Sequence, residues 1–341
     1  MHILIYGVGA VGGMLGTRLA LAGADVTFLT RPAYRSQFAD GLTVIVNGKP
    51  ASLPEPALVT RLEDVSHPVD AILLCIKMYD LEAAIDEMQA GNTGAVLVSF
   101  INGVESEGVL ARAFGTETII PATLTSAVSR KEAHTFIVSR ERGVGIAGDH
   151  PLVPALLQAF QTAGFYTRSY SSGDQMKWSK LLSNITANAT AAILGWTAGD
   201  VFAHDGTYRL ELAALREAVA VMAAMDLRVA PLPRLPLHLL QPALCLPGAL
   251  LRPLLTRMVA GGRGGKPPSF SFDIGKGRSE VAWLNGAVAR IGTEHGVDAP
   301  VNRALTAILL ELVEGRASES LQDQPERLLA RIAAAGAASI I

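Results

Sequence analysis

The 341-residue sequence has only two cysteines and a formal net charge of −2. Cys75 and Cys245 are too few for a disulfide framework and lack metal-ligand spacing, so we interpret them as small apolar residues in a reducing compartment. The small net charge indicates no basic surface for nucleic acid or an anionic membrane. The seven histidines lack paired metal-ligand spacing as well, so we expect no metal site.

Membrane-directing features are also scarce. The first residues, MHILIYG, lack the basic region and long apolar segment of a signal peptide. The apolar stretch Leu235–Val259 is interrupted by four prolines and two arginines, whereas a membrane-spanning helix needs about 20 largely apolar residues. We therefore expect a cytoplasmic protein without a membrane partner, in which the segment 230–268 forms short helices and loops. Its apolar residues suit either a buried core or the interface of a homodimer.

The first 30 residues have the order strand, glycine turn, helix, strand. An apolar run at His2–Tyr6 precedes the pattern Gly-x-Gly-x-x-Gly, and a helix at Val11–Ala22 and a strand at Asp25–Thr30 should follow. In such a turn the first glycine permits a tight bend, the second lets the backbone approach a pyrophosphate, and the third lets helix and strand pack closely. A merely glycine-rich turn is the alternative. The predicted dinucleotide site consists of Gly7, Val8, Gly9, Ala10, Val11 and Gly12.

The end of the second strand indicates which dinucleotide is bound. A site for NAD would place an acidic residue there for the ribose 2′-hydroxyl, but the sequence reads Phe-Leu-Thr-Arg up to Arg31. A guanidinium can form bidentate, charge-assisted bonds to a 2′-phosphate. Thr30 offers a hydroxyl and Arg35 a second charge one helical turn further on. We therefore predict NADP(H) as the cofactor; the alternative is that Arg31 is a solvated loop residue.

Polar residues follow two further apolar strands. The run Val69–Ile76 is followed directly by Lys77, and the run Ala95–Ile101 by Asn102 and a glycine. In open α/β sheets, ligands bind beyond the carboxyl ends of the strands. Lys77 and Asn102 are therefore candidate site residues, although each is also compatible with an ordinary loop.

The remaining pattern predicts two domains. Strand-like segments between Thr118 and Ala147 indicate an antiparallel extension of the sheet, followed by a helix at Leu152–Ala163 and a strand at Phe165–Tyr170. Helical periodicity dominates from about residue 172. We therefore expect a Rossmann-type, doubly wound α/β domain at 1–171 and an all-α domain at 172–341. The main helices of the second domain are expected at Lys177–Leu194, Tyr208–Met225, Phe270–His295 and Val301–Val313.

One polar stripe stands out in the predicted helix Lys177–Leu194. Lys180, Asn184 and Asn188 fall at i, i+4 and i+8, which would place a cation and two amides on one face. Asparagine is a mediocre helix former, so two of them in mid-helix carry a local cost. The stripe is either a solvated surface or one side of a binding site.

Several motifs of this chain together resemble the ketopantoate reductase (2-dehydropantoate 2-reductase) family of NADPH enzymes in pantothenate synthesis. They are GVGAVGG, Arg31, IKMYD, FINGV, WSKLLSNITANATAAILG and PSFSFDIGKGRSEVAWLNG, and they span nearly the whole chain. The resemblance implies a Rossmann-type domain followed by an all-α domain like that of 6-phosphogluconate dehydrogenase. It also implies that Lys77 and Asn102 line the junction between nicotinamide and substrate, with Asn102 in contact with both.

The same resemblance assigns roles in the second half of the chain. Lys180 matches the family's proton donor, Asn184 and Asn188 its substrate-binding amides, and Glu280 its acid at the cofactor and active site. Ser269 matches the contact to the substrate carboxylate. The spacing from Asp273 to Glu280 is one residue shorter than is usual in the family, which affects the match of Ser269 more than that of Glu280.

We therefore expect an oxidoreductase that uses NADPH to reduce ketopantoate to pantoate, with Lys180 as proton donor. Three alternatives remain open. One is reduction of a different 2-keto acid or related carbonyl compound by the same fold. Another is a non-catalytic NADP-binding regulator. The last is a 6-phosphogluconate or 3-hydroxyacid type dehydrogenase, which would lack the WSKLLSN and KGRSE motifs.

Overall fold

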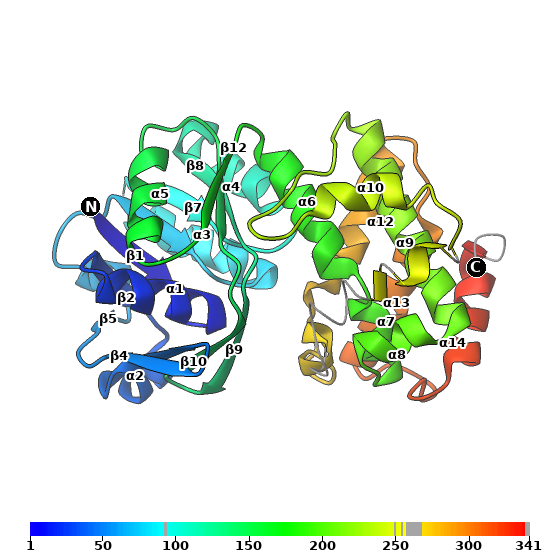
Figure 1. The fold of residues 1–341 in the computed structure, drawn as a ribbon. Coiled ribbons are helices and arrows are strands. Elements are labelled where there is room, and N and C mark those ends of the chain that lie inside the picture. The colour runs from blue at the N-terminus through cyan, green and yellow to red at the C-terminus, as the bar shows by residue number, and fades with distance from the viewer. Residues whose placement is uncertain (92–93, 249, 254, 257–267, 338–341) are drawn as a thin grey trace. The chain divides into compact units, whose positions relative to one another are not determined.

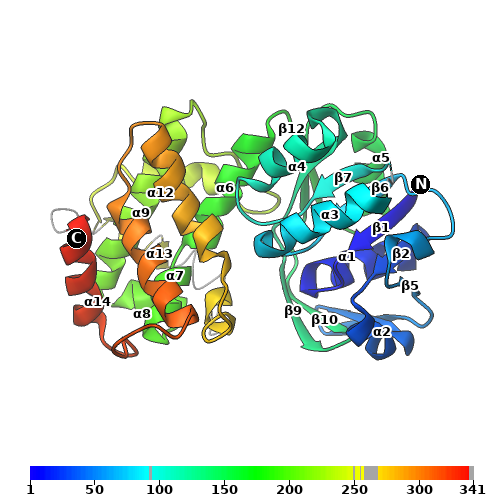
Figure 2. The same ribbon diagram turned by 180° about the vertical axis from the view of Figure 1, so that it is seen from behind.

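The computed structural model describes residues 1–91, 94–248, 250–253, 255–256 and 268–337. The chain forms two compact units, shown in Figures 1 and 2. The first consists of Met1–Lys177 and Leu232–Leu235, and the second of Trp178–Pro231 and Pro236–Ile341. The division falls inside helix α6 (Gly173–Ile185). None of the described helices is both long and apolar enough to cross a membrane.

The first unit contains an eight-stranded sheet with the order β12-β11-β8-β7-β6-β1-β2-β5. All neighbouring strands are parallel except β11 and β8. The order reverses direction at β1, which lies between β2 and β6, as in doubly wound dinucleotide-binding folds. The strands are β1 (His2–Tyr6), β2 (Asp25–Leu29), β5 (Ala57–Val59), β6 (Ala71–Leu74), β7 (Val96–Ser99), β8 (Ile119–Leu124), β11 (Val144–Ala147) and β12 (Thr167–Tyr170).

Helices cover both faces of this sheet. α1 (Ala10–Leu21) and α5 (Val153–Thr162) pack together on one face, while α3 (Leu81–Gly91) and α4 (Ser106–Phe114) pack together on the other (Figures 1 and 2). β6 is apolar and fully buried, and so is the middle of β1 at Ile3, Leu4 and Ile5, as expected of parallel strands covered on both sides. The predicted α/β class of the first domain is confirmed.

A second, four-stranded sheet has the order β4-β3-β10-β9. The predicted antiparallel extension of the main sheet is therefore only partly right, because just β11 extends it in that way. Buried Val44 and Phe136 face α1 from β3 and β10, so this small sheet builds its own layer against that helix. Its strands are β3 (Leu42–Val46), β4 (Lys49–Leu53), β9 (Ala127–Glu132) and β10 (Thr135–Arg140), and α2 (Pro32–Ala39) lies between β2 and β3 in the chain.

The second unit is helical, which confirms the predicted class of the second domain. Its long helix α9 (Asp205–Ala224) packs against several other helices and is buried on most of its surface. Its exposed residues, among them Arg209, Arg216 and Ala220, fall on one narrow stripe, so most of the helix belongs in the core. The others are α7 (Asn188–Leu194), α8 (Ala198–Ala203), α10 (Leu240–Ala243), α12 (Asn285–Glu294), α13 (Pro300–Val313) and α14 (Pro325–Ile332), with shorter turns η4 (Leu237–Leu239), η5 (Ser269–Phe272), η6 (Glu280–Trp283) and η7 (Ala333–Ala337).

Two buried glutamates of α9 accept hydrogen bonds from backbone N–H groups at the starts of neighbouring helices. Glu211 accepts a 2.6 Å hydrogen bond from the backbone N–H of Ala187, just before α7. Glu217 accepts the backbone N–H groups of Val301 and Asn302 at the start of α13, at 2.8 and 2.9 Å. The first N–H groups of a helix have no partners within the helix, so a carboxylate there supplies both acceptor and favourable charge. Burial raises the pKa of Glu217 in spite of these bonds.

Two predicted helices are interrupted. The segment Lys177–Leu194 is not one helix: α6 ends at Ile185 and α7 begins at Asn188. Ala187 between them has a left-handed backbone with φ of 53°, and Glu211 fixes this break by binding its N–H. The second case is Phe270–His295, where the positive φ angles of Gly275 and Gly277 leave only η5, η6 and α12 helical. The predicted i, i+4, i+8 stripe therefore ends at Asn184.

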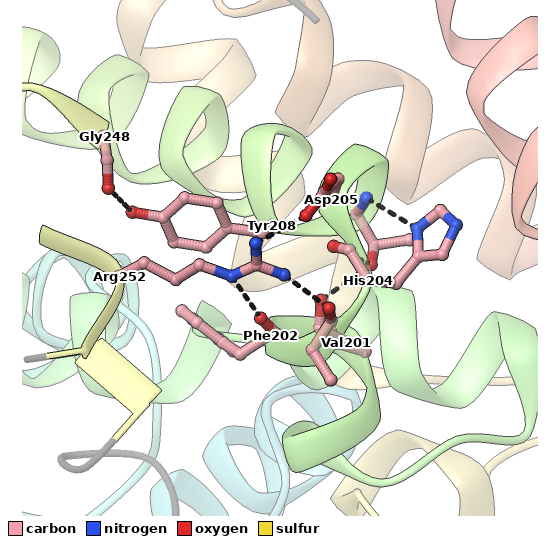
Figure 3. Close-up of polar contacts among 9 residues, drawn as sticks. Val201, Phe202, His204, Asp205, Tyr208, Gly248 and Arg252 are labelled. Carbon is pink, nitrogen blue, oxygen red and sulfur yellow. Dashed lines mark hydrogen bonds and ion pairs between the residues drawn. The ribbon is translucent and has the colours of Figure 1, made fainter. Parts of the chain in front are cut away.

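Within the proline-rich segment, η4 and α10 are short, as predicted, while residues 249, 254 and 257–267 lie outside the described part. Arg252 attaches this segment to the end of α8 (Figure 3). Its Nε donates to the carbonyl of Phe202 at 3.1 Å, and its two terminal nitrogens donate to the Ala203 carbonyl and the Asp205 carboxylate. The guanidinium also lies 5.1 Å from the ring centre of Tyr208. Arg252 thus satisfies C-terminal carbonyls of α8.

Candidate cofactor and substrate site

A cavity of about 750 Å³ lies in the first unit at the carboxyl ends of β1, β2 and β6. Its position matches the rule that ligands of open α/β sheets bind beyond the strand ends, at the point where the strand order reverses. Most of the cofactor-site residues predicted within this unit line the cavity. They are Gly7, Val8, Gly9, Ala10, Val11, Arg31, Lys77 and Asn102.

The three glycines of the turn differ in their surroundings. Gly7 has φ of +99°, a conformation that other residues rarely adopt. A Cβ on Gly12 would lie 2.1 Å from the carbonyl oxygen of Gly7, so Gly12 lies beneath the cavity and serves the packing of α1. A Cβ on Gly9 would meet no heavy atom of the described residues within 4 Å. The open space above Gly9 fits the close approach of a ligand to the backbone.

Helix α1 begins at this turn without a side-chain cap. Gly9 is the N-cap residue, and no side chain in the described part of the chain caps the first N–H groups of the helix. These donors and the positive end of the helix dipole form a site for an anion. The residues present therefore fit the pyrophosphate of a dinucleotide.

Arg31 lies at the rim of the cavity. Its backbone caps the start of α2, and its guanidinium binds the carboxylate of Asp80 at 3.2 Å. The side chain is 64% exposed, so it remains accessible to a ligand. Arg35, which we considered as a second cation, is not among the lining residues. The structure places Arg130 of β9 there instead.

Tyr6 and Glu87 form a second polar contact in the cavity. The phenol of Tyr6 donates a hydrogen bond to the Glu87 carboxylate. Burial, this hydrogen bond and the nearby charge of Glu87 raise the pKa of the phenol above its ordinary value, so it stays protonated near neutral pH. The sequence did not predict this pair, because neither residue belongs to a recognised sequence pattern.

Lys177 holds the end of strand β7. Its ammonium group donates to the carbonyl oxygens of Ser99 and Ile101 at 3.0 and 2.8 Å and forms a 2.7 Å ion pair with Glu107. The lysine is only 3% exposed. Asn102 follows directly on Ile101, so Lys177 fixes the backbone that presents Asn102. The sequence pattern predicted Lys177 only as the first residue of a helix.

The second unit contains the other predicted site residues. Lys180 and Asn184 are half-buried and one turn apart on α6. Asn188 is buried at the start of α7 and donates a 2.9 Å hydrogen bond to the hydroxyl of Ser269. Glu280 is buried at the start of η6. Asn188 and Ser269 are thus brought together, in spite of the shortened spacing that follows Ser269.

The glycine turn, the strand order and the all-α second unit define a two-domain dehydrogenase-type protein with a dinucleotide-binding first domain. Residues 3–149 match the family model described as "Ketopantoate reductase PanE/ApbA", and residues 174–313 match its C-terminal counterpart. The chain belongs to the ketopantoate reductase family.

Similar proteins extend along nearly the whole chain. A 2-dehydropantoate 2-reductase of Halobacterium salinarum is 25% identical over 320 residues, which cover 91% of this chain and 98% of that protein. A crystal structure of a PanE/ApbA family ketopantoate reductase from Ralstonia eutropha has a TM-score of 0.78 at 24% identity, covering 93% of this chain and 99% of the other. D-mandelate dehydrogenase with NADH and anilino(oxo)acetate has a TM-score of 0.76 at 19% identity, with the same coverage.

Proposed function

We propose that this protein reduces 2-dehydropantoate (ketopantoate) to pantoate with NADPH, a step of pantothenate biosynthesis. The observation that carries the proposal is the cavity of the first unit, where the open space above Gly9 and the exposed guanidinium of Arg31 line one pocket. Relatives named 2-dehydropantoate 2-reductase that match over nine-tenths of the chain support the substrate.

The first unit binds the cofactor in this proposal. The N–H groups at the start of α1 hold the pyrophosphate, and Arg31 holds the 2′-phosphate of the adenosine. Lys77 and Asn102, which follow β6 and β7, contact the nicotinamide half, and Asn102 also contacts the substrate. Glu280 of the second unit completes the cofactor contacts.

The second unit binds and protonates the substrate. The bound nicotinamide supplies a hydride for C2 of the keto acid. Lys180 donates a proton to the carbonyl oxygen, where negative charge develops during the reaction. Asn184 and Asn188 bind other polar groups of the substrate, and the hydroxyl of Ser269 binds its carboxylate. Glu280 orients the ammonium group of Lys180.

Steady-state kinetics with NADPH and NADH side by side test this function. We expect ketopantoate-dependent oxidation with a higher kcat/KM for NADPH. In Arg31→Ala the kcat/KM for NADPH should fall by about tenfold or more, because a charge-assisted contact contributes about 1.5–3 kcal/mol. The value for NADH should change little. An enzyme that prefers NADH, or a variant that loses both activities equally, would contradict the assignment of Arg31.

A second candidate is the reduction of a different 2-keto acid. The fold shared with D-mandelate dehydrogenase supports it, because mandelate is also a 2-hydroxy acid. A panel that includes ketopantoate, benzoylformate and short aliphatic 2-keto acids separates the two candidates. The second candidate is favoured if any other acid gives a clearly higher kcat/KM than ketopantoate.

A further inference from the structure

The rim of the cofactor cavity carries a cation that no dinucleotide sequence pattern includes. Arg130 lies on β9, about 100 residues along the chain from Arg31, and lines the same cavity. Its guanidinium lies 5.7 Å from the ring centre of Tyr34, a residue of α2 that also lines the cavity. This distance is within the range of a cation–π contact, which orients the guanidinium without using its N–H donors.

Arg130 and Arg31 differ in whether a carboxylate of the cavity pairs with their guanidinium groups. The guanidinium of Arg31 shares its charge with the carboxylate of Asp80. The other acidic residue of the cavity, Glu87, accepts the hydroxyl of Tyr6. Among the described residues, no carboxylate pairs with Arg130 and no protein acceptor binds its N–H groups. Arg130 therefore contributes a positive charge that the surrounding protein does not neutralise.

A phosphate monoester is the ligand chemistry that fits this arrangement. It carries a charge of about −1.5 to −2 at neutral pH and offers three acceptor oxygens. An Arg31–Asp80 pair alone has a net charge near zero, so it balances such a group poorly. Arg130 adds a full charge and a planar set of donors that matches phosphate geometry.

The small sheet fixes Arg130 relative to the glycine turn. In the register of β9 and β10, Arg130 is paired with Phe136. The ring of Phe136 packs on Gly13, directly after the Gly-x-Gly-x-x-Gly pattern, where an added Cβ would lie 2.0 Å from its Cζ atom. This close packing attaches the sheet to α1. Arg130 is therefore held by a rigid support, although it is on an edge strand and exposed.

We infer that Arg130 is a second specificity residue for the 2′-phosphate, positioned by Tyr34 and by the docking of the small sheet on α1. The inference rests on the proposed function, since it deepens the proposed preference for NADPH. It assigns a role to the four-stranded sheet, whose edge strand supplies a ligand contact. It also gives the phosphate a cation that is not already shared with Asp80.

Direct binding of NADPH and NADH to the full-length protein, measured by nucleotide fluorescence without keto acid, tests the inference. Arg130→Ala should raise the Kd for NADPH by about tenfold or more and leave the Kd for NADH nearly unchanged. Lys131→Ala is the matched control, because it removes the same charge from the next position of β9, which does not line the cavity. It should leave both Kd values nearly unchanged. Equal effects of Arg130→Ala on both nucleotides, or no effect on either, would overturn the inference.

Two further outcomes separate the inference from the proposed function. If the wild-type protein prefers NADPH and Arg130→Ala loses that preference, but no ketopantoate is reduced, the proposed function fails and the inference stands. If the wild-type protein reduces ketopantoate with NADPH and Arg130→Ala keeps the full preference, the inference fails and the function stands. Arg130→Lys should retain part of the preference, since it keeps the charge but loses the planar donors.

Discussion

The ring of Phe136 lies so close to Gly13 that a Cβ on Gly13 would be 2.0 Å from the Cζ atom of Phe136. The fourth glycine of GVGAVGG therefore serves a packing contact rather than the turn itself. Phe136 is fully buried, and the contact joins the small sheet to α1. One glycine of a nucleotide-binding motif is thus required by the packing of the fold and not by the nucleotide.

Substitution of Gly13 tests this contact. Gly13→Ala should lower the free energy of unfolding by about 1–3 kcal/mol, because a methyl group is forced into a filled space. Phe136→Leu should itself destabilise the protein, but in the double variant the cost of Gly13→Ala should shrink. Urea unfolding of the four proteins measures the coupling. Additive effects would show that Gly13 and Phe136 act independently.

Gly9 and Gly12 should respond in opposite ways to the same change. Gly9→Ala should leave stability nearly unchanged and weaken nucleotide binding, because the added methyl group enters only the cavity. Gly12→Ala should destabilise the protein by about 1–3 kcal/mol or more, since its methyl group meets the carbonyl oxygen of Gly7. Thermal unfolding and NADPH titration distinguish the two. Normal NADPH affinity in Gly9→Ala would contradict the proposed approach of the pyrophosphate.

The ion pair of Lys177 and Glu107 should be important for both stability and the site. Lys177→Met removes the partner of a mostly buried carboxylate and of two backbone carbonyls, so we expect a loss of about 3 kcal/mol or more in unfolding free energy. Adding Glu107→Met should recover part of this loss, because no unpaired charge then remains. Urea unfolding measures both effects. A double variant no more stable than Lys177→Met would contradict this explanation.

Arg252 should stabilise the proline-rich segment mainly through backbone carbonyls (Figure 3). Arg252→Ala should cost about 1–2 kcal/mol, since the C-terminal carbonyls of α8 lose their donor. Asp205→Asn removes only an exposed ion-pair partner and should have little effect on stability. Differential scanning calorimetry of the two variants checks that Arg252→Ala lowers stability more than Asp205→Asn does. The opposite order would assign the role of Arg252 to its ion pair.

Local sequence patterns predicted much of the first unit. The glycine pattern, the apolar strands and the residues after them depend on neighbours in the chain, and eight of the predicted cofactor residues line one cavity. Arg130 and Lys177 could not be found in this way. Their partners lie about 70 to 100 residues away in the chain, Tyr34 on α2 for Arg130 and Glu107 on α4 for Lys177. A single arginine or lysine carries no local signal of such contacts.

The break between α6 and α7 shows the same limit in the second unit. The periodicity of Lys180, Asn184 and Asn188 fits one continuous helix, and the residues around Ala187 have no proline or glycine to end it. Glu211, on another helix, stabilises the left-handed conformation of Ala187 by accepting its N–H. A tertiary hydrogen bond therefore overrides the local helical preference.

Ketopantoate-dependent oxidation of NADPH by wild-type protein and by Lys180→Ala tests the central claim most directly. We expect turnover by the wild-type protein and a kcat lower by about 10²–10⁴-fold in the variant, because proton donation to the carbonyl oxygen is lost. NADPH affinity and the unfolding midpoint of the variant should stay close to the wild-type values. Near-normal turnover by correctly folded Lys180→Ala, or no keto acid reduction by a wild-type protein that binds NADPH, would contradict the account.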